Sequence, residues 1–395
     1  MHAPSSTTLI VDSATRSKVL LSALCDAYEA YALSGDMCHR LCHTRNWSFI
    51  SLHQDGGTAI IMGIGDQKIV LKSQYATIDQ FDELEPDGSE EEFTNAVSSI
   101  PQLFLLTLYS MICTSDGVME SEYALRGHTR RKNKKYMRGI LGTSEYPNFV
   151  THDSQVIAII NKSLMLGWSS HHKRQLIELV WPKYQRIRRA PLSKADRRSV
   201  WTLLSQQEYI NLRLLPLSGV TPKVVGTCGH FYQVEPLVRF HLSEYLLKLR
   251  TNILFHLMGT LKLLDTFINE PLQICDLRFD NLGLSADYPK RFMVLDASKL
   301  YTQSRLNALL TTRTCTNDTD CPILDCLSQC NLTTGYCTGR INHNVQVFCT
   351  NLLPQLFGDN WSRSDQYLAA CDTSVPFEQR IARLRLNWAW LLPEV

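Results

Sequence analysis

The sequence lacks a strong net charge and an apolar run of membrane-spanning length. Its 40 basic and 38 acidic residues leave a formal charge of +2 over 395 residues, which gives no general attraction to nucleic acid or to an anionic membrane. The apolar run 103–113 is too short to cross a bilayer, and residues 1–28 contain no signal-peptide core. We therefore expect no nucleic-acid partner, and membrane association only through an anchor absent from this chain.

The sequence also lacks any C-x-x-C pair, although it contains 13 cysteines. Six of them fall in a segment rich in Asn, Asp, Thr and Gly with little apolar periodicity: Cys315, Cys321, Cys326, Cys330, Cys337 and Cys349. A segment that cannot bury its own core is typically held by disulfides, which persist in oxidising compartments. Zinc is the alternative, but zinc sites favour closely spaced cysteine pairs. We predict disulfides among these six, with fifteen pairings open, and Cys275 either as a buried free thiol or paired with a distant cysteine.

Five Asn-X-Ser/Thr sequons point to the same compartment. They are Asn46, Asn161, Asn317, Asn331 and Asn360. Each triplet is weak evidence by itself because it often arises by chance, but two of them lie inside the cysteine-rich segment. We predict N-glycosylation at these positions, on the lumenal side of the secretory pathway.

Hydrophobic periodicity predicts a β-rich region followed by helices and short strands. Residues 48–74 alternate between apolar and polar side chains and contain Gly turns, which predicts a three-stranded meander. Residues 223–237 predict a hairpin that turns at Gly229. Helices are expected over 19–31, 196–213 and 241–269, and short strands over 272–277 and 291–298.

Five polar residues follow these elements in the order that a protein kinase uses. Phosphoryl transfer needs a cation on the nucleotide phosphates, metal ligands, and a base that orients the acceptor hydroxyl. Kinases take these groups from a Lys that ends the third strand, a helical Glu, a D-x-x-x-x-N loop and an Asp after the next strand. The sequence offers them as Lys72, Glu208, Asp276 with Asn281, and Asp296. Each residue alone is common, so the prediction depends on their order and structural context.

Three longer segments resemble a known family. They are WTLLSQQEYINLRLL with TPKVVGTCGHFYQVEPL, ICDLRFDNLGLS with MVLDAS, and the cysteine-rich stretch TNDTDCPILDCLSQCNLTTGYCTGRINHNVQVFC. Together they are similar to the divergent protein kinase domain family, cysteine-rich proteins related to pancreatitis-induced protein. The resemblance covers residues 45–395. It implies a two-lobed protein-kinase fold and the lumenal domain of a type II single-pass protein of the endoplasmic reticulum.

The resemblance also implies a role for each polar residue. The nucleotide phosphates would be held by Lys72, paired with Glu208, and covered by the turn at Gly56 and Gly57; Asp276 would be the catalytic base; Asn281 and Asp296 would bind the metal. ATP with Mg²⁺ or Mn²⁺ is the implied cofactor. The glycine turn matches G-x-G-x-x-G only in part.

An EF-hand-like insert between the third strand and the Glu208 helix is implied as well. Such a loop needs carboxylates at its first, third and fifth positions. With Asp196 as the twelfth position, these positions hold Gln185, Ile187 and Arg189. We therefore expect no calcium at this degenerate loop.

Two further departures concern the switch of an ordinary kinase. The His-Arg of H-R-D is replaced by Ile274-Cys275, and the Phe-Gly of D-F-G by Ala297-Ser298. The cysteine-rich segment 315–349 lies where a kinase has its activation segment. Because a loop pinned by disulfides cannot become ordered upon phosphorylation, we expect a constitutive site.

The predicted fold class is α+β, with the two lobes of a protein kinase. Residues 1–45 form a helical extension, 46–235 an N-lobe with the degenerate EF-hand-like insert at about 75–195, and 236–395 a C-lobe that includes the cysteine-rich module. The predicted function is a secretory-pathway protein kinase that transfers phosphate from ATP to hydroxyls of lumenal or secreted proteins. The alternative is a pseudokinase that serves as a nucleotide-binding or protein-interaction scaffold in the endoplasmic reticulum.

Overall fold

The computed structural model describes residues 6–43, 45–54, 56–78, 179–181, 193–240, 242, 247–267, 270–286, 291–358 and 368–390. Most of the predicted insert 75–195 lies outside the described residues, including the EF-hand-like positions 185–190. The sequons at Asn161 and Asn360 also lie outside them. Among the described helices, none is long and apolar enough to cross a membrane.

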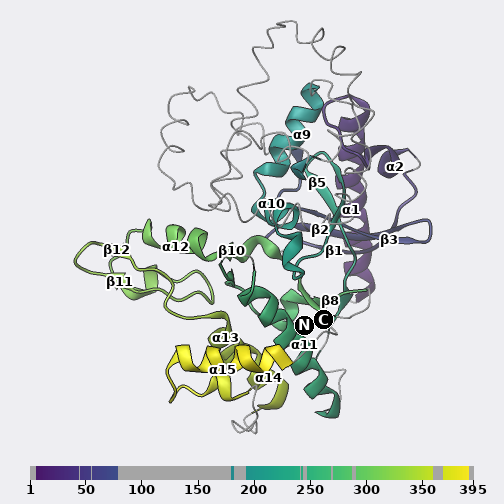
Figure 1. The fold of residues 1–395 in the computed structure, drawn as a ribbon. Coiled ribbons are helices and arrows are strands. Elements are labelled where there is room, and N and C mark those ends of the chain that lie inside the picture. The colour runs from purple at the N-terminus through teal and green to yellow at the C-terminus, as the bar shows by residue number, and fades with distance from the viewer. Residues whose placement is uncertain are drawn as a thin grey trace, which may run out of the picture. The chain divides into compact units, whose positions relative to one another are not determined.

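A five-stranded antiparallel sheet is built from two distant parts of the sequence (Figure 1). Its strands are β1 (Ser48–His53), β2 (Thr58–Ile64), β3 (Gln67–Ser73), β4 (Val224–Cys228) and β5 (Phe231–Val234), in the order β1-β2-β3-β5-β4. The predicted meander and hairpin are both present. The hairpin turns at Gly229, whose φ of +57° is favourable for glycine only. The pairing of β3 with β5 sets Lys72 opposite Tyr232.

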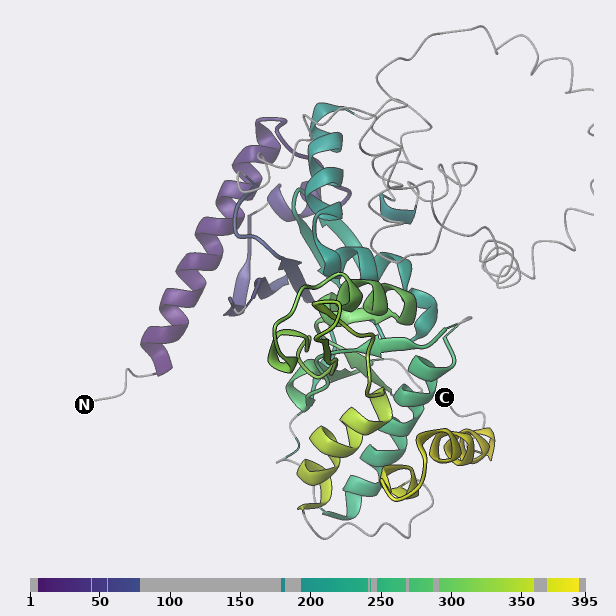
Figure 2. The same cartoon turned by 90° about the vertical axis from the view of Figure 1, so that its left-hand side faces the viewer.

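Helix α1 (Ser6–Glu29) lies along this sheet in both views (Figures 1 and 2). It begins well before the predicted start at residue 19. Leu21 and Leu24 are buried in one core with Ile60 and Met62 of β2. Two disulfides fasten the short helix α2 (Cys38–Cys42) to its neighbours, one to α1 through Cys25–Cys42 and one to β4 through Cys38–Cys228.

The predicted helix 196–213 is two helices, α9 (Lys194–Leu204) and α10 (Gln207–Leu214). The break lies at Gln206, whose backbone is extended (φ −98°, ψ 109°). Its buried side chain donates to the carbonyls of Thr202 and His230 and accepts the N–H of Gln74. The bonds to His230 and Gln74 tie the Gln206 side chain to segments next to β5 and β3, so tertiary contacts override the helical periodicity.

The second part of the described chain packs around helix α11 (Leu247–Asp265). Leu254, Leu257, Leu261 and Leu264 are buried along one face, as the apolar stripe predicted. The short strands β6 (Val238–Arg239), β8 (Leu282–Leu284) and β9 (Phe292–Val294) form one sheet, and β7 (Leu272–Ile274) pairs with β10 (Leu300–Thr302). The predicted strands 272–277 and 291–298 are therefore present as β7 and β9, but they pair with other strands and not with each other.

Helix α12 (Gln303–Thr311) leads into the cysteine-rich module, which contains the hairpin β11 (Cys330–Asn331) and β12 (Tyr336–Cys337). Helices α13 (Asn344–Val347), α14 (Leu353–Phe357) and α15 (Phe377–Trp390) follow. Within the module, Cys315 pairs with Cys330 and Cys321 with Cys337. Cys326 and Cys349 instead pair outside it, with Cys275 and Cys371. The six cysteines are thus disulfide-bonded as predicted, but they are not a closed set.

Candidate functional site

A cavity of about 720 Å³ lies between the five-stranded sheet and the elements around β8, β9 and α12. Its apolar part is lined by Ala59 and Val70 of the sheet, by Val234 and Leu237, and by Leu282 of β8. The polar part is lined by Lys72, Glu208, Asn281 and Asp296. Four of the five residues singled out by the kinase order therefore line one cavity.

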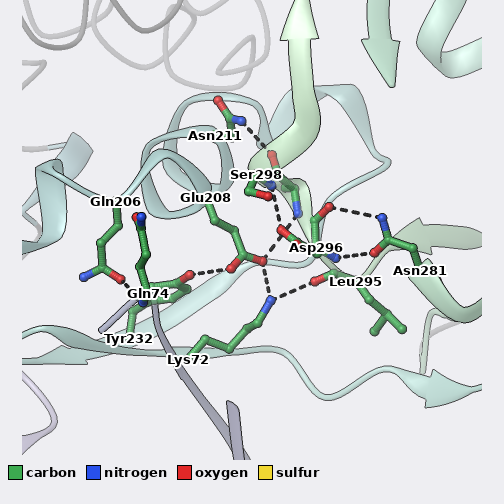
Figure 3. A network of polar contacts seen from close by, with 11 residues as sticks. Lys72, Gln74, Gln206, Glu208, Asn211, Tyr232, Asn281, Leu295, Asp296 and Ser298 are labelled. Atoms are coloured by element: carbon green, nitrogen blue, oxygen red, sulfur yellow. Dashed lines mark hydrogen bonds and ion pairs between the residues drawn. The ribbon is translucent and has the colours of Figure 1, made fainter. Parts of the chain in front are cut away.

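Lys72 connects strand β3 of the sheet to the residue that follows strand β9. Its ammonium forms an ion pair with Glu208 of α10 and donates to the Leu295 carbonyl at 2.9 Å (Figure 3). Both side chains of the pair are mostly buried, with 16% and 14% exposed. A pair this shielded is screened less by salt than a surface pair. It fixes the ammonium at the cavity wall, next to Asp296.

Glu208 has further donors besides Lys72. Its Oε2 accepts the hydroxyl of Tyr232 at 2.7 Å, and the N–H of Ala297 lies 3.4 Å from its Oε1. Tyr232 is fully buried, and burial together with the nearby Glu208 carboxylate raises its pKa well above the usual value. The hydroxyl therefore stays protonated and remains a donor.

Asp296 and Asn281 face each other across the polar end (Figure 3). The Asn281 Oδ1 accepts the backbone N–H of Asp296 at 2.7 Å, and its Nδ2 donates to the Asp276 carbonyl at 3.0 Å. The Asp296 Oδ1 accepts the N–H of Ser298 at 2.8 Å. Asp296 is exposed to the cavity. Asn281 is buried, and its side chain connects the Asp276 loop to the backbone of Asp296.

Asp276 is paired with Arg278 and does not line the cavity. Both carboxylate oxygens accept from Arg278, at 2.6 and 2.9 Å, and this contact raises the pKa of Arg278. Asp280 of the same loop lines the cavity, whereas Asp276 and Arg278 do not. The predicted base is therefore linked to the site through its backbone carbonyl, which accepts from Asn281, while its carboxylate is held by the exposed guanidinium of Arg278.

The glycine turn lies on the sheet side of the cavity. Gly56 and Gly57 both line it, and Gly56 has a φ of +66°. A Cβ on Gly57 would come within 3.2 Å of the Ser73 carbonyl. Glycine at position 57 therefore allows the start of β2 to lie close to the end of β3, the strand that carries Lys72.

The loop that carries Asp276 is held by the cysteine-rich module. Cys275 is disulfide-bonded to Cys326, so its predicted pairing with a distant cysteine is present and the free thiol is not. Asp325 accepts the N–H of Leu277 at 2.7 Å and the Asn351 side chain at 3.0 Å. Sequence motifs did not single out Asp325 or Tyr232, because each acts through pairing between distant segments.

The remaining predicted sites lie apart from the cavity. Asn46, Asn317 and Asn331 are exposed. The Asp196 carboxylate, assigned to the exit of the degenerate EF-hand-like loop, accepts from Ser193 in a capping box of α9 and from the Ser34 hydroxyl at 2.5 Å.

A paired Lys and Glu, a braced Asp and Asn, and an antiparallel sheet above them are the features of a protein-kinase-like domain. Residues 200–374 match the family model of the protein-kinase domain of FAM69. This segment therefore matches a divergent protein-kinase domain family, as the resemblance indicated. The match includes Glu208, Asp276, Asn281 and Asp296, and Lys72 lies N-terminal to it. No solved structure matches the chain.

Proposed function

We propose that the protein binds ATP in this cavity and transfers its γ-phosphate to hydroxyl groups of lumenal or secreted proteins. The observation that carries the proposal is the buried Lys72–Glu208 pair, which is tied to Leu295 beside the exposed Asp296. A fixed ammonium and a nearby carboxylate in a partly apolar cavity are two of the groups that phosphoryl transfer requires.

The two-lobed arrangement of a kinase is part of this proposal. The five-stranded sheet with α10 would be the smaller lobe, and α11 with β7–β10 the larger one. Segment 235–240 would then connect the lobes, and the adenine ring would lie between Val70 and Leu282. The insert at about 75–195 would be a degenerate EF-hand-like element without calcium.

The residues at the polar end fit a divalent metal in part. Asp296 offers a carboxylate oxygen to the cavity, as Mg²⁺ or Mn²⁺ prefers. The Asn281 Oδ1 already accepts the Asp296 N–H, so its second lone pair would be the ligand. When bound, the metal would neutralise charge on the phosphates. Lys72 would hold the α- and β-phosphates beneath the turn at Gly56 and Gly57.

Asp276 would act as the base that orients the acceptor hydroxyl. Arg278 holds both of its oxygens, so the acceptor must displace at least one of these hydrogen bonds. Arg278 is largely exposed, with 61% of its side chain accessible, and a surface pair of this kind costs little to open. The released guanidinium would face the transferred phosphate.

The pseudokinase is the second candidate, and one contact favours it. The bidentate Arg278–Asp276 pair neutralises the base in the structure. If the pair stayed closed with nucleotide bound, the domain would bind ATP and transfer nothing. A scaffold in the endoplasmic reticulum would then be the function.

Phosphotransfer separates the two candidates. Wild type, D276A and D296A would be purified from a secretory host and incubated with radiolabelled ATP, Mg²⁺ or Mn²⁺, and a mixture of secreted proteins. We expect incorporation by wild type and a loss of at least 100-fold in both variants, in line with removal of a general base or a metal ligand. Equal incorporation by all three would reject the kinase.

Thermal unfolding in the presence of ATP–Mg²⁺ tests the nucleotide site separately. Saturating ligand at 100 times its Kd stabilises the native state by about 2.7 kcal/mol. K72M should lose this stabilisation, whereas the matched control K262M on α11 should keep it. Stabilisation of wild type without phosphotransfer would support the nucleotide-binding pseudokinase. No stabilisation at all would reject both the kinase and the nucleotide-binding form of the pseudokinase.

The location is proposed on chemical grounds. Six disulfides tie the described residues together, and disulfides of this number are typical of oxidising compartments. We propose the lumen of the endoplasmic reticulum as this compartment. Non-reducing mass spectrometry, which detects the disulfides, and glycosidase treatment, which detects the glycans, test this location.

A further inference from the structure

Two basic side chains that line the cavity have no acidic partner among the described residues. They are Lys299, at the end of the short helix after Asp296, and Arg305, in the first turn of α12. Both belong to the segment that follows the proposed metal ligand Asp296. Val234, Glu235 and Leu237, which also line the cavity, belong to or follow β5 on the sheet side.

Arg305 is held in an environment that disfavours its charge. Its Nε is buried without a hydrogen-bond partner, and no carboxylate of the described residues pairs with its guanidinium. Burial lowers its pKa. Other arginines of the described chain also have one buried nitrogen without a partner, among them Arg291, Arg340 and Arg380, but of these only Arg305 lines the cavity. A half-buried cation costs free energy unless an anion joins it.

Lys299 adds a second positive charge to the lining of the cavity. Its ammonium forms no ion pair with the described residues, and its backbone carbonyl accepts the N–H of Cys275. That bond fixes Lys299 next to the loop that carries Asp276. Two cations near the proposed base, both facing the cavity, form a subsite for an anionic group. A planar guanidinium favours a carboxylate, which it binds through two parallel hydrogen bonds.

We propose that Lys299 and Arg305 bind a carboxylate of the acceptor, so that the acceptor is a serine or threonine within an acidic polypeptide segment. This inference rests on the proposed phosphotransfer function and names its substrate class. The nucleotide is the other possible source of an anion. Lys72 and a metal at Asp296 would serve the phosphates, which leaves Lys299 and Arg305 for an anionic group of the acceptor.

Peptide binding tests the subsite without requiring catalysis. Two fluorescein-labelled peptide pools would each carry a central serine, flanked by Glu in one pool and by the isosteric Gln in the other. Fluorescence anisotropy would be recorded at 0.15 M salt with a non-hydrolysable ATP analogue and Mg²⁺. We expect at least 10-fold tighter binding of the Glu pool by wild type. R305Q and K299Q should each lose most of this preference, and R383Q, which removes an exposed arginine of α15, should keep it.

Each outcome decides between the possibilities. Equal binding of the two pools by wild type, no binding of either, or an unchanged preference in R305Q would overturn the inference. Loss of ATP–Mg²⁺ stabilisation in R305Q would assign the arginine to the nucleotide and overturn it too. A preference that depends on Arg305, together with no phosphotransfer, would retain the subsite and reject only the kinase. Phosphotransfer without any acidic preference would retain the kinase and reject only the subsite.

Discussion

Tyr232 is the residue through which the sheet fixes Glu208. The two oxygens of that carboxylate are occupied from opposite sides, one by the Tyr232 hydroxyl and the other by Lys72. Tyr232 comes opposite Lys72 because β3 and β5 pair in that register. An ordinary kinase breaks its Lys–Glu pair when its helix moves. Here the pair is bonded to the sheet on both sides, which favours the constitutive site expected from the sequence.

The substitution Y232F removes this donor and keeps the ring. Glu208 then retains a buried oxygen without its partner, so we expect the free energy of unfolding to fall by about 1–3 kcal/mol. The apparent KM for ATP should rise as Lys72 loses its fixed position. Urea denaturation measures the first effect and nucleotide titration the second. Y336F, at an exposed tyrosine of the cysteine-rich module, should change neither, and equal losses in both variants would contradict the assignment.

His230 occupies the turn of the β4–β5 hairpin as a buried histidine. Only 2% of it is exposed, and its Nε2 lies 3.2 Å from the Ala76 carbonyl. Burial lowers its pKa to about 4, although the Ala76 carbonyl opposes the shift. In the unfolded chain a histidine titrates near pH 6.5. Between these two values the unfolded state therefore binds a proton that the native state does not.

Stability should therefore be complete above about pH 6.5 and fall as the pH falls toward 4, by up to about 3 kcal/mol. H230N removes the group, so its free energy of unfolding should decline less over this window. Denaturant unfolding of wild type and H230N at pH 7 and pH 4.5 measures how much stability each protein loses. The effects of carboxylates are the same in both proteins, so they cancel when the two losses are compared. H256N, at an exposed position of α11, should keep the wild-type dependence. An unchanged slope in H230N would contradict the buried neutral form.

At the scale of elements, the cysteine-rich module is a support for the loop of the proposed base. It reaches that loop through the Cys275–Cys326 disulfide and through Asp325, which accepts the Leu277 N–H. The side chain of Arg340 adds bonds to Asn342 and Asn344 and contacts Gln273 of β7. Burial lowers the pKa of Arg340 to about 10. The module thus holds β7 and the Asp276 loop in one conformation.

Removing one disulfide at a time separates this role from general stability. The chain-entropy estimate gives about 4 kcal/mol for C275S/C326S and about 3 kcal/mol for C315S/C330S, with sequence separations of 51 and 15. The two losses of stability should be similar. Only C275S/C326S should also lower phosphotransfer per folded molecule, because only that bond is adjacent to Asp276. Equal activity of the two variants at a temperature where both are folded would contradict the supporting role.

The elements that the sequence predicted well are those whose signal is local. The meander 48–74 and the hairpin at Gly229 follow from alternation and turn residues, and both are present. The break at Gln206 and the pairing of β7 with β10 depend on contacts between distant segments, which periodicity does not contain. The same limit applies to the candidate site. The order of residues along the chain predicted Lys72 and Asp296. Tyr232 and Arg305 could not be predicted in this way, because their roles depend on strand register and on the shape of the cavity.

For the whole molecule, covalent links connect parts that the sequence separates widely. Cys38–Cys228 closes a separation of 190 residues, which contains the predicted insert. Three further disulfides connect separate parts: Cys25–Cys42 joins α1 to α2, Cys275–Cys326 joins the Asp276 loop to the module, and Cys349–Cys371 joins the module to the segment before α15. Helix α1 is held on the sheet by packing in the shared core. Because these bonds hold the buried core and the site together, folding should require an oxidising compartment.

Expression in two compartments tests this requirement. From a secretory host, alkylation without reduction should leave twelve cysteines unmodified, in the pairs of the structure, and N-glycosidase should lower the mass. N46Q, N317Q and N331Q, at the exposed sequons, should each remove one glycan. Protein made in a reducing cytosol should be largely insoluble, because each missing native disulfide costs about 2–5 kcal/mol against a typical total of 5–15. Alkylation of Cys275 and Cys326 in soluble, ATP-binding protein would contradict the dependence on disulfides, since the site would then form without its covalent support.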